Sequence, residues 1–114
     1  ELCRVRSADK EARGCLVCNS VAELVGVDEA LGKMLDEALR ERVRKMRVLF
    51  KRAEERGELE FRDGAADAAN AFVAFLLGIN LLSKSVHDEN TLWRTCRVFL
   101  SGLGFAEADL DEAD

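Results

Sequence analysis

Residues 64–87 read GAADAANAFVAFLLGINLLSKSVH and carry the clearest helical pattern in this 114-residue chain. Apolar residues recur at three- and four-residue spacing on two faces, which together cover most of a helix circumference. The two faces consist of Phe72, Phe75, Leu76, Ile79 and Leu82, and of Val73, Leu77 and Leu81. One core face of a small domain requires less apolar surface than this. The sequence therefore predicts a helix that is capped by Asp63 and that also contacts a partner.

Two helices are predicted before this stretch. Residues 14–25 (GCLVCNSVAELV) are apolar on most sides, and a short helix of that kind is expected to be enclosed by others. Residues 28–56 carry a long apolar stripe opposite a charged face, which indicates an amphipathic helix. Asp28 is a suitable N-cap for this helix, and Gly57 is a suitable end.

A last helix is predicted to begin at Asp88 or Asn90, because an apolar stripe follows at helical spacing. The stripe consists of Leu92, Cys96, Phe99 and Leu103. No strand pattern is present, so the expected fold is an all-α antiparallel bundle of about four helices. The last two helices carry surplus apolar surface and are expected to form a four-helix bundle with a second copy of the chain.

Length and charge limit the classes of function. The chain is long enough for one domain, and its net charge of -5 does not favour direct binding to the phosphates of nucleic acids. The hydrophobic content of 48% excludes disorder, and the unbroken apolar runs are far shorter than the roughly 18 residues of a membrane span. Because the sequence starts at Glu1, it is expected to be one piece of a longer protein. Residues 1–13 are expected to be the end of a preceding helix or a loop, residues 14–106 the domain, and residues 107–114 an acidic tail.

Three features follow one another in a recognisable order. A helix start carries Arg13-Gly14-Cys15-Leu16-Val17, together with Asn19 and Glu23-Leu24. A long amphipathic helix then ends in Arg56-Gly57-Glu58-Leu59. Two paired helices extend from Asp63 to Gly104. This order resembles the C-terminal domain of the tetracycline-repressor-like (TetR/AcrR) transcriptional regulators. The resemblance extends from about Arg13 onward.

The resemblance implies a cytoplasmic homodimer that regulates transcription, usually as a repressor. Such regulators bind operator DNA with an N-terminal helix-turn-helix, which this sequence does not contain. Their C-terminal domain holds a small-molecule effector among its helices and dimerises through its last two. Effector binding then changes the distance between the two DNA-binding domains of the dimer, and repression is released.

Two sets of residues are candidates for these roles. The candidate effector contacts are Cys15, Asn19, Glu23, Arg42, Met46, Phe50 and Phe72, and the candidate dimer contacts are Val73, Leu76, Leu77, Asn80, Leu81, Trp93, Cys96, Phe99, Leu100 and Leu103. Each candidate effector contact also has a purely structural interpretation. Arg42 could lie along the core and pair with Glu23, Asn19 could join two helices, and the aromatic and methionine side chains could be core.

Cys15 and Cys18 form a CxxC motif with several possible meanings. A zinc site would require a second cysteine or histidine pair, which the sequence lacks, so neither a metal nor a cofactor is expected. Helical thiol-redox enzymes of the alkylhydroperoxidase-D type place a histidine four residues after the second cysteine, where this chain has Ala22. Packing residues or an oxidant-sensing thiol remain as interpretations, in a reducing cytoplasm. The chain is not expected to be an enzyme, and a helical interaction module without a ligand is the alternative to an effector-binding domain.

Overall fold

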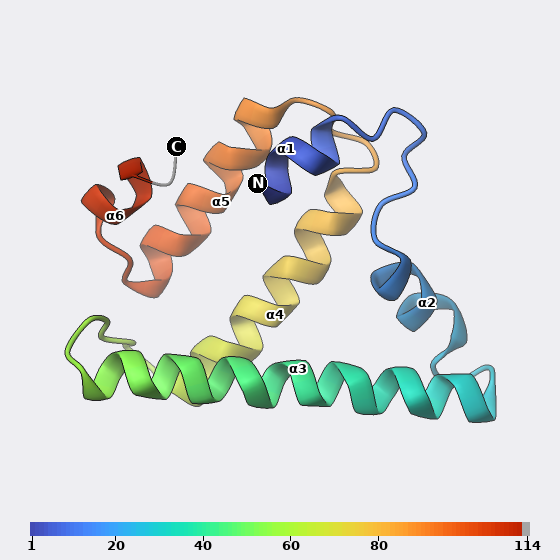
Figure 1. Cartoon of the computed structure of the whole chain (residues 1–114), viewed down its shortest axis with the longest axis horizontal. Coiled ribbons are helices and arrows are strands. Elements are labelled where there is room, and N and C mark those ends of the chain that lie inside the picture. Colours follow the sequence, from blue (N-terminus) through green and yellow to red (C-terminus); the bar gives the residue numbers. More distant parts are fainter. Residues whose placement is uncertain (113–114) are drawn as a thin grey trace.

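The computed structural model describes residues 1–112, which form α-helices joined by turns and loops (Figure 1). The helices are α1 (Leu2–Ser7), α2 (Leu16–Leu24), α3 (Glu29–Glu55), α4 (Ala65–Leu82), α5 (Glu89–Leu103) and α6 (Glu107–Glu112). No strand occurs within these residues, and the predicted all-α fold is confirmed.

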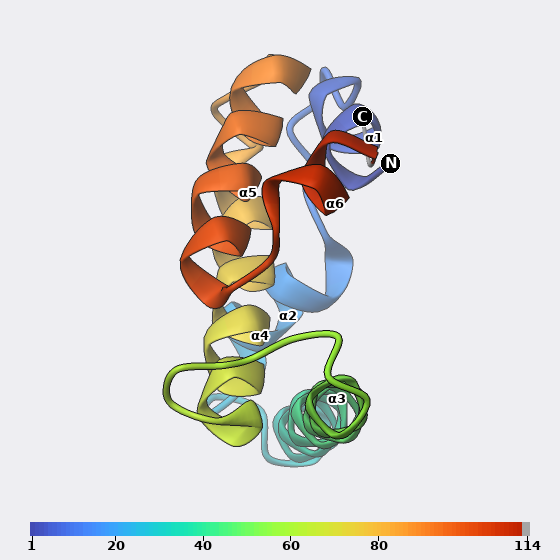
Figure 2. The same cartoon turned by 90° about the vertical axis from the view of Figure 1, so that its left-hand side faces the viewer.

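The helices form a thin assembly rather than a closed bundle. The long helix α3 lies along one edge, while α4 rises from it and α5 returns antiparallel to α4 (Figure 1). Seen along α3, helix α5 lies in front of the upper part of α4, and α6 lies beside α5 (Figure 2). The Cα extents are 42 × 31 × 17 Å, so the shortest dimension is less than two helix diameters. Such a thin arrangement leaves much of the α4–α5 pair on the surface.

A first core cluster joins α3 to the beginning of α4. Phe50 of α3 lies on a surface of small side chains, Ala65, Ala68 and Ala69, which recur at helical spacing on α4. The ring of Phe50 stacks on that of Phe61, with 4.6 Å between ring centroids. Partly buried side chains complete this cluster: Met46, Leu59, Phe72 and Leu103.

A second core cluster joins α1 and α5 to the end of α4. Cys3 of α1 packs with Ile79 of α4 and with Leu92 and Cys96 of α5, and all four are buried. Residues 1–13 therefore contain a helix that packs on the rest of the chain. Between the two clusters, the rings of Phe75 and Phe99 stack with their centroids 4.1 Å apart.

The expected cap of α3 is confirmed, and Asp88, one of the two expected starts of the last helix, is the cap of α5. Asp28 accepts a hydrogen bond from the Leu31 backbone N–H at 2.8 Å, and Asp88 accepts one from the Thr91 N–H at 2.8 Å. The prediction for Asp63 is wrong, because Gly64 is the N-cap of α4 and adopts φ 88°, a conformation that favours glycine. The Asp63 carboxylate instead pairs with Arg62.

Helix α4 is shorter than the sequence pattern predicts. It ends at Leu82, and residues 83–88 form a turn and a loop before α5 begins. The Ser83 hydroxyl donates to the Asn80 carbonyl at 2.8 Å, so this side chain competes with the continuation of the helical ladder.

The prediction that residues 14–25 form an enclosed helix is also wrong. Helix α2 has no buried residue, and Leu16 is 81% exposed. Helix α2 contacts α3 and α4 on one side only, so most of its apolar circumference faces solvent.

The acidic segment folds back onto α5 over its described part. Residues 107–112 form α6, whose Leu110 is buried, and residues 113–114 of the predicted tail lie outside the described residues. Arg97 of α5 pairs with Glu107 and with Asp111, each at 2.7 Å. Repulsion among the acidic side chains is thus partly offset by a cation on α5.

Helix α4 has more apolar surface than its own chain covers. By length and composition it is the one helix of residues 1–112 that could cross a membrane, a test that core helices of soluble proteins also pass. Only 28% of its 18 residues are buried, and the exposed ones include Leu81 and Leu82 at its end, which leaves part of the helix for a further contact.

Replacement of Asp28 by alanine is expected to lower the free energy of unfolding by about 1 kcal/mol, because α3 loses its side-chain cap. The matched control is Asp63→Ala, which removes a carboxylate that caps nothing and should leave stability almost unchanged. Urea unfolding followed by circular dichroism measures both. Equal losses for the two variants would contradict the assignment of Gly64 as the cap of α4.

Candidate functional site

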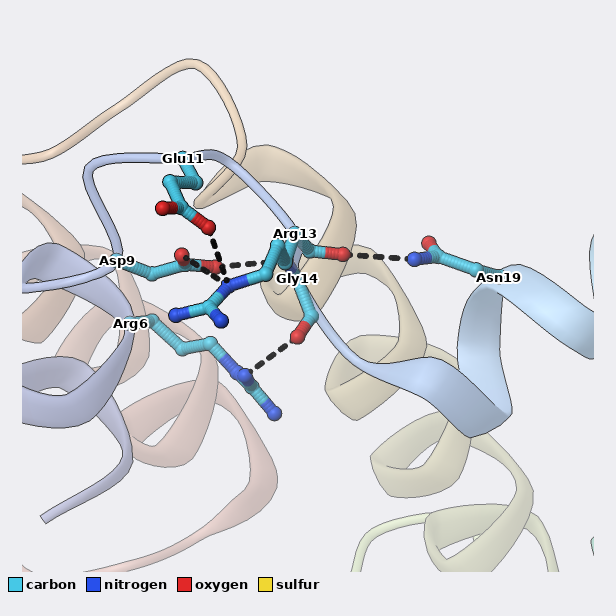
Figure 3. A network of polar contacts seen from close by, with 6 residues as sticks. All are labelled: Arg6, Asp9, Glu11, Arg13, Gly14 and Asn19. Atoms are coloured by element: carbon cyan, nitrogen blue, oxygen red, sulfur yellow. Dashed lines mark hydrogen bonds and ion pairs between the residues drawn. The ribbon is translucent and has the colours of Figure 1, made fainter.

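The connection between α1 and α2 is held by a polar network (Figure 3). One oxygen of Asp9 accepts from the Gly14 backbone N–H at 2.8 Å, and the other accepts from Arg13 Nε at 3.3 Å. Gly14 has φ +67°, and a Cβ atom there would lie 3.1 Å from the Lys84 side chain. The Asp9 contacts and the glycine conformation together fix where α2 begins. We call this network the α1–α2 junction: Arg6, Asp9, Arg13, Gly14, Cys15, Cys18 and Asn19.

Arg6 connects the α1–α2 junction to α4. Its Nε atom donates to Asn80 Oδ1 at 2.6 Å, and its Nη1 atom donates to the Gly14 carbonyl at 2.7 Å. Asn80 is buried and in turn donates to the Leu76 carbonyl at 2.7 Å. Both acceptors of Arg6 are neutral oxygens, which satisfy its hydrogen bonds but do not cancel its charge. The polar residue in the apolar helix α4 therefore holds a partly buried cation in place.

The two cysteines of the CxxC motif lie at the start of α2 in different electrostatic environments. Cys15 is the N-cap residue, and its partial burial opposes ionisation. The Cys18 and Val17 backbone N–H groups, the Cys18 thiol and the Arg6 charge outweigh burial and lower the Cys15 pKa. The backbone N–H groups act on the Cys15 sulfur electrostatically, without a cap hydrogen bond of good geometry. Burial and the neighbouring Cys15 raise the Cys18 pKa to about 11, although Arg42 acts in the opposite direction.

An open hollow of about 580 Å³ lies beside this junction. It is lined by Val5, Arg6, Ala8, Asp9, Arg13, Gly14, Leu16 and Asn19. The apolar side chains and two guanidinium groups among these residues suit a small molecule with an apolar body and an acceptor or anionic group.

The structure divides the predicted effector contacts into two groups. Cys15 and Asn19 lie at the junction, where the Asn19 amide donates to the Arg13 carbonyl at 2.7 Å. Arg42 is exposed on α3 and lies close enough to α2 for its charge to act on Cys18. Glu23 is exposed on α2, and the structure records no ion pair between Glu23 and Arg42 in the described part of the chain.

The second group is apolar and belongs to the first core cluster. Phe50 is buried, and Phe72 meets it edge-on with ring centroids 5.5 Å apart. Met46 packs against the same cluster and is half-buried. All three side chains thus belong to the first core cluster, as the structural interpretation of their pattern also predicts.

The predicted dimer contacts also fall into two groups. Val73, Asn80 and Cys96 are buried within the chain. Leu81 is 65% exposed, and the following side chains are partly buried: Leu76, Leu77, Trp93, Phe99, Leu100 and Leu103. The structure adds Leu82 and Val98, of which Val98 is 77% exposed.

Several residues of interest escaped sequence reasoning. Arg6 and Asp9 lie in a segment of weak periodicity, and their roles depend on contacts with distant backbone. Cys3 and Cys96 bring their thiols within 3.6 Å, although they lie 93 residues apart. The spacing of Asp9 and Arg13 (i, i+4) was the one local signal for the junction.

The described residues contain no group of three or more histidine, cysteine, aspartate or glutamate side chains that could hold a metal ion. A family model described as tetracyclin repressor-like, C-terminal domain, matches residues 2–99. The match begins at residue 2 and so includes α1, whereas the resemblance described from the sequence begins at about Arg13. Neither a curated protein nor a solved structure matches the chain.

Replacement of Asn80 by leucine is expected to lower the free energy of unfolding by about 1–3 kcal/mol, because Arg6 loses a buried acceptor. In the double variant Arg6→Met/Asn80→Leu the loss should be smaller than the sum of the single losses. Arg4→Met is the control, since Arg4 pairs with Glu1 on the surface. Strict additivity of the Arg6 and Asn80 effects would contradict the role of this contact.

Proposed function

Because the chain belongs to the tetracycline repressor-like C-terminal domain family, we propose that it is the effector-binding and dimerisation domain of a one-component transcriptional repressor. Domains of this family are regulatory rather than enzymatic. The net charge of -5 supports an assignment of DNA contacts to a separate helix-turn-helix part of the regulator. According to this proposal, the regulator acts in the cytoplasm.

The uncovered surface of α4 and α5 is the observation that carries dimerisation. Leu81 and Leu82 on α4 and Val98 on α5 are exposed, although the two helices pack together in the chain. Burial of such side chains against a second copy is favourable, at roughly 25 cal/mol per Å² of apolar surface. A two-fold axis would place the same face of each chain against the other. One interface would then cover the exposed leucines of both chains.

Effector binding is proposed at the contact of α2 with α3 and α4. Asn19, which lines the hollow beside the α1–α2 junction, and Arg42 would supply polar groups there, and Met46 and Phe72 of the first core cluster would supply apolar contacts farther along α3 and α4. Cys15, Glu23 and Phe50 complete the proposed contacts. The chemistry of this set suits a small, largely apolar molecule with an anionic or hydrogen-bond-accepting group.

A signal from the effector can reach the dimer through one connection. Arg6 bonds both to Gly14, next to the start of α2, and to Asn80 in α4. A shift of α2 on effector binding would therefore change a contact of α4, the helix proposed to form the dimer. An effector that prefers one of two α2 positions would bias the spacing of the two DNA-binding parts.

A helical interaction module without an effector is the second candidate. Phe61 and Phe72 both pack directly against Phe50, and this closed cluster favours a domain that holds no ligand in its core. The two candidates differ in whether a small molecule stabilises the folded chain.

Leu81→Asp is expected to convert the dimer to monomers, with a dissociation constant raised roughly 100-fold, because a carboxylate buried in an apolar interface costs about 3 kcal/mol. Leu81 is mostly exposed within the chain, so helix content should be unchanged. Leu49→Asp is the matched control, because Leu49 is also exposed but lies on α3. Light scattering after size-exclusion chromatography measures the mass of each variant. A Leu81→Asp dimer as tight as the parent would exclude this face of α4 as the interface.

A further inference from the structure

We propose that Cys15 and Cys18 form a reversible dithiol–disulfide switch at the start of α2, which hydroperoxides close. The proposal goes beyond effector binding and dimerisation. It rests on the local geometry of α2 and holds for either candidate function.

The register of the CxxC motif on α2 brings both sulfurs to one end of the helix. Cys15 is the N-cap residue with extended backbone angles (φ -107°, ψ 121°), and Cys18 is in the first turn. The side chain of an N-cap residue lies over the first-turn N–H groups, here those of Val17 and Cys18. Cys18 occupies the third helical position of α2, from which a side chain can reach back to the N-cap residue. The two sulfurs therefore lie at the same end of α2 before any oxidation occurs.

Charge and exposure distinguish Cys15 as the reactive sulfur. Arg6 of α1 acts on both thiols, and Arg42 of α3 acts on Cys18, so cations from two neighbouring helices face the pair. The lowered pKa of Cys15 and the raised pKa of Cys18 divide the roles between a thiolate that attacks and a thiol that resolves. Both residues are only partly buried, so a small oxidant can reach them.

The chemistry balances with a hydroperoxide as the only co-reactant. The Cys15 thiolate attacks one peroxide oxygen, which forms an S–O bond, breaks the O–O bond and releases an alcohol or, from hydrogen peroxide, water. Cys18 then attacks the sulfur of the Cys15 sulfenic acid, which forms the disulfide and expels water. Two thiols lose two electrons and two protons, and the peroxide gains both. Thiol–disulfide exchange with a reducing dithiol restores the pair.

The other pair of thiols in the chain provides an internal comparison. Cys3 and Cys96 lie 3.6 Å apart, but both are buried. Burial and the neighbouring Cys3 raise the pKa of Cys96 to about 12, and both thiols lack the access of the CxxC pair. If proximity alone decided, either pair of cysteines could form the disulfide. The mechanism proposed here requires that Cys15 and Cys18 form it.

Closure of the switch would act on the contact that positions α2. Cys15 directly follows Gly14, whose carbonyl accepts from Arg6. A disulfide leaves no thiolate on Cys15, the form that Arg6 and the first-turn N–H groups favour. The oxidised chain should therefore have a weaker Arg6–Gly14 contact and a more mobile start of α2.

The test treats the chain with stoichiometric hydrogen peroxide and maps its disulfides by peptide mass spectrometry. The expected product is a Cys15–Cys18 disulfide that dithiothreitol reverses. Cys15→Ser should lose thiols roughly tenfold more slowly than the parent, since Cys18 and Cys96 have raised pKa values and Cys3 is buried. Cys18→Ser should stop at a sulfenic acid on Cys15, which dimedone traps. Serine is itself a good N-cap, so Cys15→Ser should keep its helix content.

Cys3→Ala is the matched control, because it removes one thiol of the buried pair and should oxidise at the parental rate. A Cys3–Cys96 disulfide as the first product would overturn the proposal. Oxidation of Cys15→Ser at the parental rate, or no loss of thiols from the folded parent, would overturn it equally. None of these results would alter the mass of the dimer, so failure of the switch is separable from failure of the proposed function.

Discussion

Helix α4 contacts α3 at its first turns, α5 along its middle and the α1–α2 junction near its end, and these contacts cover only part of its apolar surface. The alanines at its start accept the rings of Phe50 and Phe61, and Phe75 stacks on Phe99 of α5. Every other helix of the domain is positioned by α4 directly or through one neighbour. The remaining apolar surface, including Leu81, is what a thin, single-chain arrangement leaves uncovered.

Asn80 is the buried polar residue of this apolar helix, and it gives α4 its connection to the amino-terminal part of the chain. An unpaired amide there would be costly, but Arg6 and the Leu76 carbonyl satisfy it. The same arginine holds the carbonyl of Gly14, immediately before the CxxC motif. A single guanidinium thus relates the start of α2 to the proposed dimer helix, and its charge also favours the Cys15 thiolate.

The sequence could predict features that depend on local patterns. The long helix α3, its Asp28 cap and the helical pair α4–α5 follow from periodicity and from capping residues close in sequence. The prediction that Asp63 caps α4 was wrong because an aspartate before a helix is ambiguous when a glycine follows. Gly64 occupies the cap position with a positive φ. The end of α4 was misplaced because apolar residues continue at Val86, although Ser83 already interrupts the helix.

Tertiary contacts were less accessible to sequence reasoning. The apolar circumference of α2 predicted enclosure, but a thin fold has no helices left to enclose it, and Leu16 stays exposed. The pairing of Arg6 with Asn80 joins residues 74 positions apart, and no local spacing signals it. Likewise, the acidic composition of residues 107–112 gave no sign that Leu110 would be buried and that Arg97 would hold α6.

The central claim is that the surplus surface of α4 and α5 is covered by a second copy of the chain. Sedimentation equilibrium of the unmodified chain over a range of concentrations tests this most directly. The account predicts a species of twice the 12.7 kDa chain mass, with dissociation only on dilution. A mass of 12.7 kDa at every concentration would contradict it, because the apolar face would then remain in water.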